Sequence, residues 1–391
     1  MKQYLDFNAT TPVFTESAEV IKKFLIEDFG NAGSRTHQSG ADAKKAVAET
    51  RRLIASSMDA DESELIFTSG ATESNNIALF GLIENAKKVN KNKVVTTLIE
   101  HKAVLDPLAE ASKQDIEVVY VAPNSDGMVE TDRIKDALDS KTFLVSCMHA
   151  NNETGVINPI DEMADEIKAY DPTIMFHTDC AQTFGKTNLS LKNQNIDLIS
   201  FSGHKFHGPK GIGGLLMRKQ DGFSLPITPR YFGGGQERGI RPGTLPVPLI
   251  VGMGKSFEIC SKQQDNWHSK CSEIKLSALK ALSELDHKIY GYQDARSLPN
   301  TLSVALGGLT ADALIIILKD VAELSTGSAC TSEAFTPSHV LTAMGASDDE
   351  AKKVARFSWG PETDPNVFNE IISVIKAVSY THLTLPTILL V

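Results

Sequence analysis

The sequence DLISFSGHKFHGPKGIGGLLMR, residues 197–218, is the stretch that best predicts the fold of this chain. It begins with an apolar run at 198–201, continues with Ser-Gly-His-Lys at 202–205 and ends in a glycine-rich segment. An apolar run followed by polar residues is typical of a buried strand that ends where open α/β sheets bind their ligands. We therefore expect an α/β fold with a ligand site at this point.

Lys205 is the residue of this stretch whose chemistry needs an explanation. A lysine that follows a core strand and lies beside His204 can lose part of its hydration, which suits a Schiff base with a carbonyl compound. The alternative is a surface lysine in a glycine-rich turn, which is common in short loops. These residues alone leave both interpretations open.

Length and composition indicate an ordinary globular protein. The 391 residues suffice for two domains, and 41% hydrophobic and 23% charged residues are usual proportions. The net charge of −10 argues against nucleic acid or an anionic membrane as the main partner. The amino-terminal sequence lacks a signal peptide, and no run approaches the roughly 20 apolar residues of a membrane span, so we expect a cytoplasmic protein.

The cysteines predict neither a disulfide framework nor a metal site. They are odd in number, lie far apart and form no C-x-x-C pair: Cys147, Cys180, Cys260, Cys271 and Cys330. We expect free thiols and no bound metal.

Strand and helix patterns alternate through the first half of the chain. Apolar runs occur at 94–99, 116–121, 143–148, 174–178 and 198–201, with helical patterns such as 103–113 and 160–170 between them. This alternation predicts βαβ units and a mostly parallel sheet. Most runs are followed by polar residues, namely 100–102, 149–153, 179–182 and 202–205. The carboxyl ends of parallel strands meet at one edge, so these residues predict a shared ligand site.

Residues 65–76 predict a strand, a tight turn and the start of a helix. The turn places Ala71 and Thr72 at the helix amino terminus, where free N–H groups bind phosphate well. The alternative is that Thr72 only caps the helix. Both interpretations are about equally supported.

The second half of the chain predicts a smaller domain. After the glycine-rich segment 233–244, a long helical pattern runs to about residue 285, and strands are expected at 300–306 and 322–325. Helices are expected at 310–319, 337–344, 348–354 and 365–378. We expect a large domain at 15–260, a small domain formed by 1–14 and 261–378, and a foreign tail at 379–391, whose sequence SYTHLTLPTILLV breaks the helical pattern.

The convergent polar residues match the needs of pyridoxal phosphate. This cofactor requires a lysine for its aldehyde, a carboxylate for its ring nitrogen, a stacking partner and a phosphate cradle. Lys205, Asp179 and His101 are candidates for the first three roles. The expected phosphate ligands are Thr72, Ser202 and His204. Asp179 alone could be a helix cap and His101 a satisfied strand-end histidine, but the combination favours the cofactor.

Nine motifs resemble those of class V, fold type I pyridoxal-phosphate enzymes, and more narrowly cysteine desulfurases of the NifS/IscS type. They are LDFNATTP, FTSGATESNN, EHKAVL, NNETG, HTDCAQTFGK, SFSGHKFHGPKGIG, GGGQERGIRPGTLP, STGSACTS and RFSWG, and they cover nearly the whole chain. The resemblance implies a large domain with a mostly parallel seven-stranded sheet flanked by helices, plus a smaller α+β domain. It also implies a homodimer that converts L-cysteine to L-alanine and leaves the sulfur as a persulfide on an enzyme cysteine.

The resemblance assigns roles to individual residues. Lys205 would form the Schiff base and Asp179 would meet the pyridinium nitrogen, while Gln182 and Asn152 would meet the ring hydroxyl. The phosphate would be bound by Ala71 with Thr72 and, from the neighbouring subunit, by Thr244. Arg356 and Asn31 would bind the substrate, and the guanidinium of Arg356 suits its carboxylate.

Cys330 of GSACTS would be the nucleophile. Its small, flexible surroundings suit a thiol that must reach first a buried substrate and then an outside acceptor. Only a few per cent of an ordinary thiol is ionised at neutral pH, so a nearby base such as His101 would help. Cys180 stands where the family usually has alanine, which would place a second thiol beside the cofactor.

Two other functions fit parts of this pattern. Another class V enzyme, such as a selenocysteine lyase or a small aminotransferase, would differ in whether Cys330 is essential. A non-catalytic sulfur-relay or scaffold-binding protein would not need Lys205, Asp179 and His101 together. The sequence does not name the sulfur acceptor, which could serve iron–sulfur assembly, tRNA thiolation or DNA modification.

Overall fold

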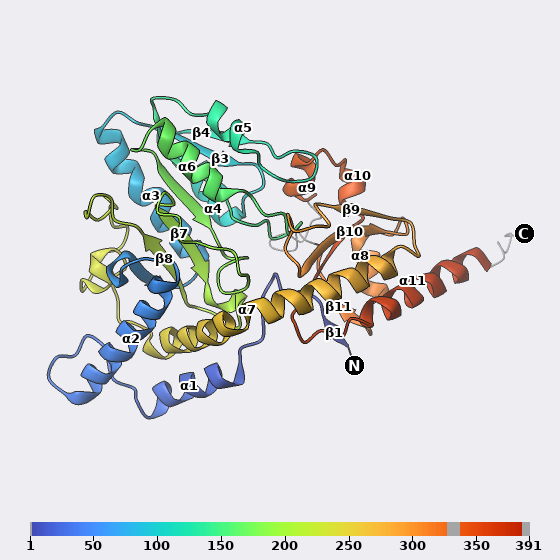
Figure 1. Cartoon of the computed structure of the whole chain (residues 1–391), viewed down its shortest axis with the longest axis horizontal. Helices are drawn as coiled ribbons and strands as arrows, with labels where there is room; N and C mark the ends of the chain where they lie inside the picture. Colours follow the sequence, from blue (N-terminus) through green and yellow to red (C-terminus); the bar gives the residue numbers. More distant parts are fainter. Residues whose placement is uncertain (1, 327–336, 385–391) are drawn as a thin grey trace, which may run out of the picture.

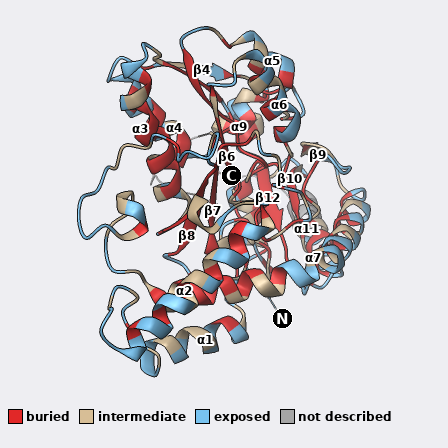
Figure 2. Cartoon of the chain, turned by 60° about the vertical axis from the view of Figure 1, so that its left-hand side comes forward, coloured by how far each residue is buried: buried red, intermediate tan, exposed pale blue. Residues whose placement is uncertain are grey.

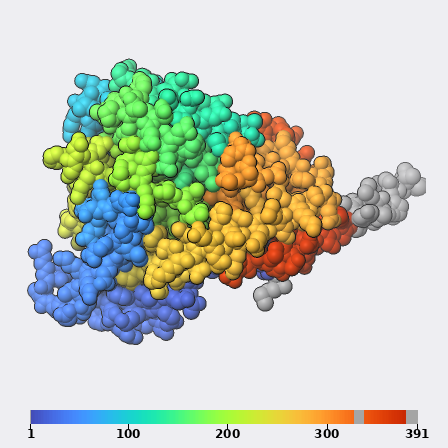
Figure 3. Space-filling model, viewed as in Figure 1, coloured from blue at the N-terminus to red at the C-terminus, as the bar shows by residue number. Residues whose placement is uncertain are grey.

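The fold, described here from a computed structural model, consists of a large α/β part and a smaller part that share one long helix, α7 (Val247–Leu282) (Figure 1). Residues 2–326 and 337–384 are described. The amino-terminal half of α7 packs in the core of the large part, and its carboxyl-terminal half packs in the core of the small part. In Figure 3 the surface of α7, in yellow and orange, extends from the amino-terminal residues of the chain, in blue, toward the carboxyl-terminal residues, in red.

A seven-stranded sheet forms the centre of the large part. Its strand order is β2 (Leu65–Thr68), β8 (Gly213–Met217), β7 (Leu198–Ser202), β6 (Met175–Asp179), β5 (Thr142–Ser146), β3 (Lys93–Thr97) and β4 (Glu117–Val121). The two pairs that involve β8 are antiparallel, and the other neighbouring pairs are parallel. A parallel crossover needs a dozen or more residues, and the loop from β7 to β8 is shorter than this, so β8 returns antiparallel. The expected mostly parallel sheet is confirmed.

Both faces of the sheet are covered by helices, which explains why its strands, apart from the edge strand β4, are buried along most of their length (Figure 2). On one face lie α3 (Ala71–Lys88) and α4 (Lys102–Ser112). On the other face lie α2 (Gln38–Ser57), α5 (Thr131–Asp136), α6 (Ile160–Tyr170) and the first half of α7. Successive strand residues alternate between the two cores, as Leu198 and Ile199 do in β7.

The small part contains a second, antiparallel sheet. Its central strand β10 (Thr301–Leu306) pairs with β9 (His287–Tyr290) and β12 (Val354–Ser358). The chain's start returns to this part, because β1 (Gln3–Tyr4) pairs with β11 (Ala322–Glu323). The helices of this part are α8 (Ala311–Ile317), α9 (His339–Ala343), α10 (Asp348–Ala351) and α11 (Val367–Thr384). The first helix of the chain, α1 (Thr15–Ile26), packs along α7 and against the core of the large part.

Two sequence expectations about this part need correction. The strands β9 and β12 were not expected; β9 has exposed residues and little hydrophobic pattern, and β12 begins where a helix was expected to end. The expectation that the sequence from Ser379 breaks the helical pattern is wrong as far as Thr384, because α11 continues to that residue. Proline is the residue most unfavourable to a helix, and the first one after α11 is Pro386.

Within residues 2–326 and 337–384, no helix has both the length and the apolar character that a membrane span requires.

Candidate active site

The polar residues that follow the parallel strands meet at one edge of the large sheet, as the sequence predicts. Lys205 closes a short 3-10 turn, Gly203–Lys205, directly after β7, and Asp179 is the last residue of the neighbouring β6. His101 follows β3, and the charges of Asp179 and Lys205 both act on its imidazole. The three residues expected to contact the cofactor ring therefore lie close together.

Asp179 is buried and held in a fixed orientation. It is 5% exposed, and its Oδ2 accepts a hydrogen bond from Nδ2 of Asn75 at 2.7 Å, while its Oδ1 accepts one from the N–H of Ala181 at 2.8 Å. Asn75 belongs to α3, the helix whose amino terminus was expected to bind phosphate. Its own Oδ1 is buried and has no hydrogen-bond partner among the described residues. A carboxylate held in this way can accept a further proton donor from a ligand.

The ammonium of Lys205 contacts the amino-terminal segment. Its Nζ donates to the carbonyl oxygens of Asn8 at 2.6 Å and Ala9 at 2.9 Å. Asn8 is 1% exposed and also donates through Nδ2 to Oγ1 of Thr301 at 2.9 Å and to the carbonyl of Asn152 at 3.2 Å. The segment that contains Asn8 thus connects the lysine to the small part.

Gln182 lies at the same edge of the sheet. Its Nε2 donates to the carbonyl oxygen of Asn8 at 3.0 Å, and its Oε1 accepts from Nζ of Lys186 at 2.9 Å. Both ends of this amide are therefore fixed by partners within the chain. Asn152 is the other residue expected at the ring hydroxyl, and its main-chain carbonyl oxygen accepts a hydrogen bond from Nδ2 of Asn8.

His101 caps α4 and faces solvent. Its Nδ1 accepts a hydrogen bond from the N–H of Ala103 at 3.0 Å. The surrounding protein lowers the pKa of His101 by desolvation, and the opposing effect of Asp179 is smaller. The neutral ring therefore has its proton on Nε2, since Nδ1 must supply the lone pair. In this geometry His101 is a proton donor at Nε2, and accepting a proton as the base for Cys330 would require the cap to open.

His204 is also neutral near pH 7. Burial, assisted by the charge of Lys205, lowers its pKa to about 4, and its Nδ1 lies 3.1 Å from Oγ1 of Thr10. The sequence expectation that His204 binds phosphate requires its ring to donate a hydrogen bond from Nε2.

The turn before α3 forms a cradle suited to an anion. Gly70 has φ of +152°, and a Cβ at this position would lie 3.2 Å from Oγ of Ser202. A Cβ at Gly213 would lie 2.7 Å from Cα of Gly70, so side chains are excluded where the strands and the helix start meet. The first N–H groups of a helix have no partner within it, and Ala71 and Thr72 provide them here. The hydroxyl of Ser202 and the start of α3 therefore lie together, as the phosphate prediction requires.

A recess of about 960 Å³ opens beside this helix start. Its lining includes Thr72 and Thr244, two of the expected phosphate ligands, from the same chain. The glycine-rich segment 233–244 is anchored there by two ion pairs. Arg241 Nε lies 3.0 Å from Oε1 of Glu73, and the carboxylate of Glu237 accepts two hydrogen bonds from Arg51, at 2.6 and 2.8 Å.

Arg356 lies on β12 and is 5% exposed. Its Nη2 pairs with Oδ1 of Asp6 at 2.6 Å, and its Nη1 donates to the carbonyl of Asn152 at 3.0 Å. Its Nε is buried and has no partner among the described residues. Asn31, by contrast, lies in the exposed loop between α1 and α2, and its Oδ1 accepts from the N–H of Gly33. No hydrogen bond that the structure describes connects Asn31 to the Lys205 cluster.

Cys330 lies outside the described residues, but both flanks of its segment attach near the site. On one side, Ser325 exchanges main-chain hydrogen bonds with Arg356 at 2.7 and 3.2 Å. On the other, His339 Nε2 lies 2.9 Å from the carbonyl oxygen of Glu100, the residue before His101.

Cys180 differs from the expectation of a second thiol beside the cofactor. It is 0% exposed and belongs to the core on the α6 side of the sheet, because it follows Asp179 and the strand alternates its faces. Its Sγ lies 3.9 Å from Nδ1 of His149, and burial raises the pKa of its thiol well above the ordinary range. Cys147, Cys260 and Cys271 are buried as well.

Three residues at the site were missed by the sequence analysis: Asn8, Asn75 and Lys186. All three lie within the quoted motifs LDFNATTP, FTSGATESNN and HTDCAQTFGK. Gln182 and Lys186 are four residues apart, a spacing at which two side chains meet if the segment forms a helical turn. No comparable signal connects Asn8 with Lys205, because the two are distant in sequence.

Comparison with known proteins places this site in a family. The profile of the family described as aminotransferase class-V matches residues 3–366. The chain belongs to this family. Within it, the chain groups with the IscS/NifS-type cysteine desulfurases. A mitosomal cysteine desulfurase of Trachipleistophora hominis is 39% identical over 376 residues, which cover 95% of this chain and 84% of that protein. The cysteine desulfurase IscS of Klebsiella pneumoniae is 39% identical over 375 residues, which cover 95% of this chain and 91% of that protein.

Similar solved structures agree with the fold. A NifS-like protein superposes with a TM-score of 0.89 at 34% identity, covering 97% of this chain and 100% of that one. DndA from Streptomyces lividans superposes with a TM-score of 0.80 at 41% identity, covering 92% of this chain and 99% of that one. SspA in complex with cysteine gives a TM-score of 0.80 at 33% identity, covering 93% and 100%. The α/β fold is thus that of fold type I enzymes.

Proposed function

We propose that this protein is a pyridoxal-phosphate-dependent cysteine desulfurase that converts L-cysteine to L-alanine. The observation that carries the proposal is the convergence of Lys205, Asp179 and His101 beside the helix start at Ala71 and Thr72. Relatives named cysteine desulfurase cover nearly the whole chain, and one similar structure is described as a complex with cysteine.

The residues present fit this cofactor. Asp179 offers a buried carboxylate with fixed orientation for the ring nitrogen, and the glycine-lined turn at Gly70 leaves room for a phosphate. In this proposal Ala71, Thr72, Ser202 and His204 bind the phosphate, His101 stacks on the ring, and Gln182 and Asn152 lie at the ring hydroxyl. When bound through Lys205, the cofactor supplies an electron sink that labilises bonds at the substrate α-carbon.

The chain's own residues bind the substrate and move protons. Arg356 binds the substrate carboxylate through its guanidinium, and Asn31 assists. The amine of Lys205 exchanges a proton with the substrate, and His101 donates from Nε2. Cys330 attacks the substrate sulfur, so one S–S bond forms as the C–S bond breaks. L-cysteine and a thiol thereby give L-alanine and a persulfide, with no external oxidant or reductant.

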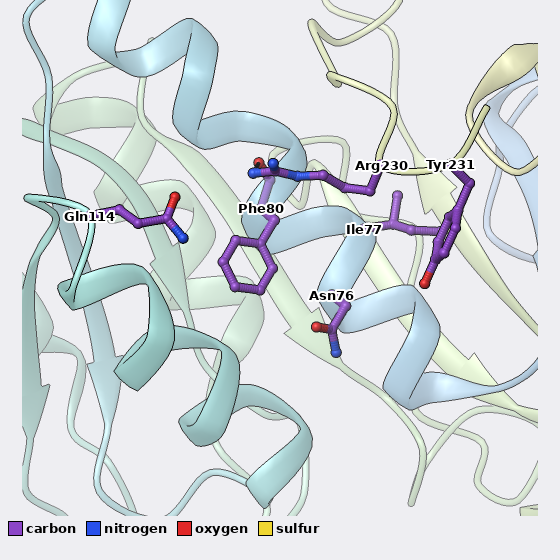
Figure 4. Close-up of a pocket in the computed structure, with 6 residues that line it drawn as sticks. All are labelled: Asn76, Ile77, Phe80, Gln114, Arg230 and Tyr231. Carbon is purple, nitrogen blue, oxygen red and sulfur yellow. Dashed lines mark hydrogen bonds between the residues drawn. The ribbon is translucent and has the colours of Figure 1, made fainter.

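A homodimer completes the proposal. Two aromatic side chains that line the cofactor recess are exposed: Phe232 is 90% exposed and Tyr231 is 52% exposed. A second recess of about 260 Å³ adjoins them, where Asn76, Ile77 and Phe80 of α3 lie opposite Arg230 and Tyr231 (Figure 4). Exposed aromatic patches of this kind mark interaction surfaces. We assign this surface to a second copy of the chain, whose Thr244 would reach the phosphate.

Mixing two inactive variants tests the shared site. If Thr244 serves the partner's phosphate, mixed Thr244→Ala and Lys205→Ala subunits should give heterodimers with one intact site. Activity recovered on mixing supports sharing, whereas a mixture as inactive as its components contradicts it.

The domain division, partners and location belong to the same proposal. We propose a large cofactor-binding domain at 15–260, a small domain formed by 1–14 and 261–378 that contains the Cys330 segment, and a non-native tail at 379–391. The expected sulfur acceptor is a protein such as an iron–sulfur scaffold, and a cytoplasmic location remains a prediction. A search for proteins that accept persulfide sulfur from the purified enzyme tests the partner.

Replacing Cys330 by serine tests the proposed reaction. The variant should retain the visible colour of the cofactor while alanine release from cysteine falls by orders of magnitude, because covalent catalysis is lost. The buried-thiol control Cys180→Ala should keep its turnover. Full desulfurase turnover by Cys330→Ser would contradict the proposal, and the same variant retaining only selenocysteine cleavage would indicate a selenocysteine lyase.

A further inference from the structure

Lys186 is a largely enclosed lysine that the proposed reaction does not use. It follows Gln182 by four residues, and its Nζ lies 2.9 Å from Oε1 of Gln182 and 3.3 Å from Oδ1 of Asn8. Lys186 also lines a narrow cavity together with Lys205, Trp267 and Trp359. Its ammonium therefore contacts the amides of the site while the side chain borders this cavity.

The environment of Lys186 is unfavourable to its charge. Burial, assisted by the nearby charges of Lys205 and Arg356, lowers the pKa of Lys186 to about 7. No carboxylate forms an ion pair with it in the part of the chain that the structure describes. A buried amine without an ion pair costs stability, so selection for stability alone does not account for it.

Independent contacts fix which atoms face Lys186. The Nδ2 of Asn8 donates to the carbonyl of Asn152, which can only accept, so Oδ1 of Asn8 is the atom turned toward the lysine. The Nε2 of Gln182 likewise donates to the carbonyl of Asn8, which turns its Oε1 toward the lysine. An amine has hydrogens to donate to both oxygens whether it is charged or neutral.

Gln182 has one amide hydrogen left after these contacts. Its Oε1 is held by Lys186 and one hydrogen of its Nε2 is used by Asn8, so the second hydrogen has a defined direction. Without Lys186 the amide would be held at one end only and could rotate about its last side-chain torsion, which is broad in glutamine.

We propose that Lys186 is a positioning residue that acts through Gln182: by holding Oε1, it directs the free N–H of Gln182 at the ring oxygen of the cofactor. This inference rests on the proposed function, because it needs the cofactor ring beside Gln182. A donor directed at the ring oxygen stabilises its anion, so loss of the donor raises the pH at which the bound cofactor gives up its proton.

The test is a pH titration of the visible absorbance of the cofactor-loaded protein. Lys186→Met removes the donor at similar length, and we expect the titration midpoint to rise by about one pH unit, which corresponds to the loss of one hydrogen bond to a charged group. Lys186→Arg should restore the midpoint because it can donate. The exposed control Lys192→Met should leave it unchanged. Titrating the apo proteins with pyridoxal phosphate should show weaker binding by Lys186→Met than by the control.

A double mutant separates positioning from a direct effect of charge. In a Gln182→Leu background, Lys186→Met should cause no further shift if Lys186 acts through Gln182. The inference is overturned if Lys186→Met raises the midpoint as much in the Gln182→Leu background as in the wild-type protein. It is also overturned if Lys186→Met alone leaves the midpoint unmoved. Lys186→Leu is the second variant should Lys186→Met not fold, with the same expected shift. A wild-type protein without a visible band overturns the proposed function and this inference with it, whereas a band with an unmoved midpoint overturns only the inference.

Discussion

The ammonium of Lys205 lies 2.6 Å from the main-chain carbonyl of Asn8, a residue distant in sequence that also bonds to the small part through Thr301. The lysine of the large sheet and the strands of the small part are therefore connected through one buried asparagine. The chain begins in the small part, where β1 pairs with β11, and Asn8 lies where it passes to the large part.

Asn8→Ala should lower the free energy of unfolding by about 1–3 kcal/mol, because the buried hydroxyl of Thr301 and the amine of Lys186 each lose a partner. Urea unfolding measures the change. The control is Asn266→Ala on the exposed face of α7, which we expect to stay within about 0.5 kcal/mol of wild type. Equal stability of the two variants would contradict the role of Asn8.

Glu100→Gln should flatten the dependence of stability on pH between about 5 and 8. Burial raises the pKa of Glu100 from 4.5 to about 8, against the opposing hydrogen bond from the N–H of Met148. The native state therefore keeps a proton that the unfolded state loses, so this contribution is fully present below pH 4.5 and is lost as the pH rises through about 8.

Urea unfolding of wild type and Glu100→Gln at several pH values checks this sign. The difference between the two proteins should change steadily across the window and become constant above it. Parallel stability profiles would show that Glu100 is ionised in the native protein.

Glu237→Ala should destabilise the protein by about 3–5 kcal/mol, because it leaves the guanidinium of Arg51 without its carboxylate partner. The side chain of Glu237 is 1% exposed and also accepts the N–H of Phe67 at 2.8 Å. Since this carboxylate anchors the segment 233–244, cofactor affinity should fall as well.

The matched control is Glu284→Ala, which breaks a surface ion pair with Lys376 of the same 2.6 Å length. Surface pairs contribute about 0–1 kcal/mol, so this variant should remain near wild type. A Glu237→Ala protein as stable as the control would show that the segment is anchored in another way.

Removal of residues 379–391 should leave the melting temperature and cofactor binding unchanged. Among the residues of α11 whose burial is described, the last fully buried one is Ile375, so the truncation keeps the contacts of that helix with the small core. Differential scanning calorimetry measures the result. A fall of many degrees would mean that the tail packs on the fold.

The sequence predicts the large sheet well, and the physical reason is local. Runs such as Leu198 to Phe201 are buried on both faces, so apolar composition alone marks them, and the polar residues after them mark the ligand edge. The edge strand β9 gives no such signal, since exposed residues such as Lys288 interrupt its pattern. Strand β12 begins shortly after α10, within the range expected to be helical, which hides its start.

The candidate site is predictable only in part. Lys205, Asp179 and His101 each follow a strand, so the topology itself brings them together. Asn8 contacts Lys205 and Lys186 from a segment distant in sequence, and no periodicity reports such contacts. The sequence also does not show that Nδ1 of His101 accepts a hydrogen bond from the N–H of Ala103. This contact determines which ring nitrogen of the neutral imidazole has the proton.

Borohydride reduction of the purified, cofactor-loaded protein tests the central claim most directly. The account predicts that the cofactor becomes permanently attached to Lys205, as mass spectrometry of the digested protein would show, and that Lys205→Ala does not retain the label. Lys186 is the informative rival, because it is a lysine near the same site whose pKa is lowered to about 7. A label on Lys186, or no label on a protein that binds the cofactor, would contradict the assignment of Lys205.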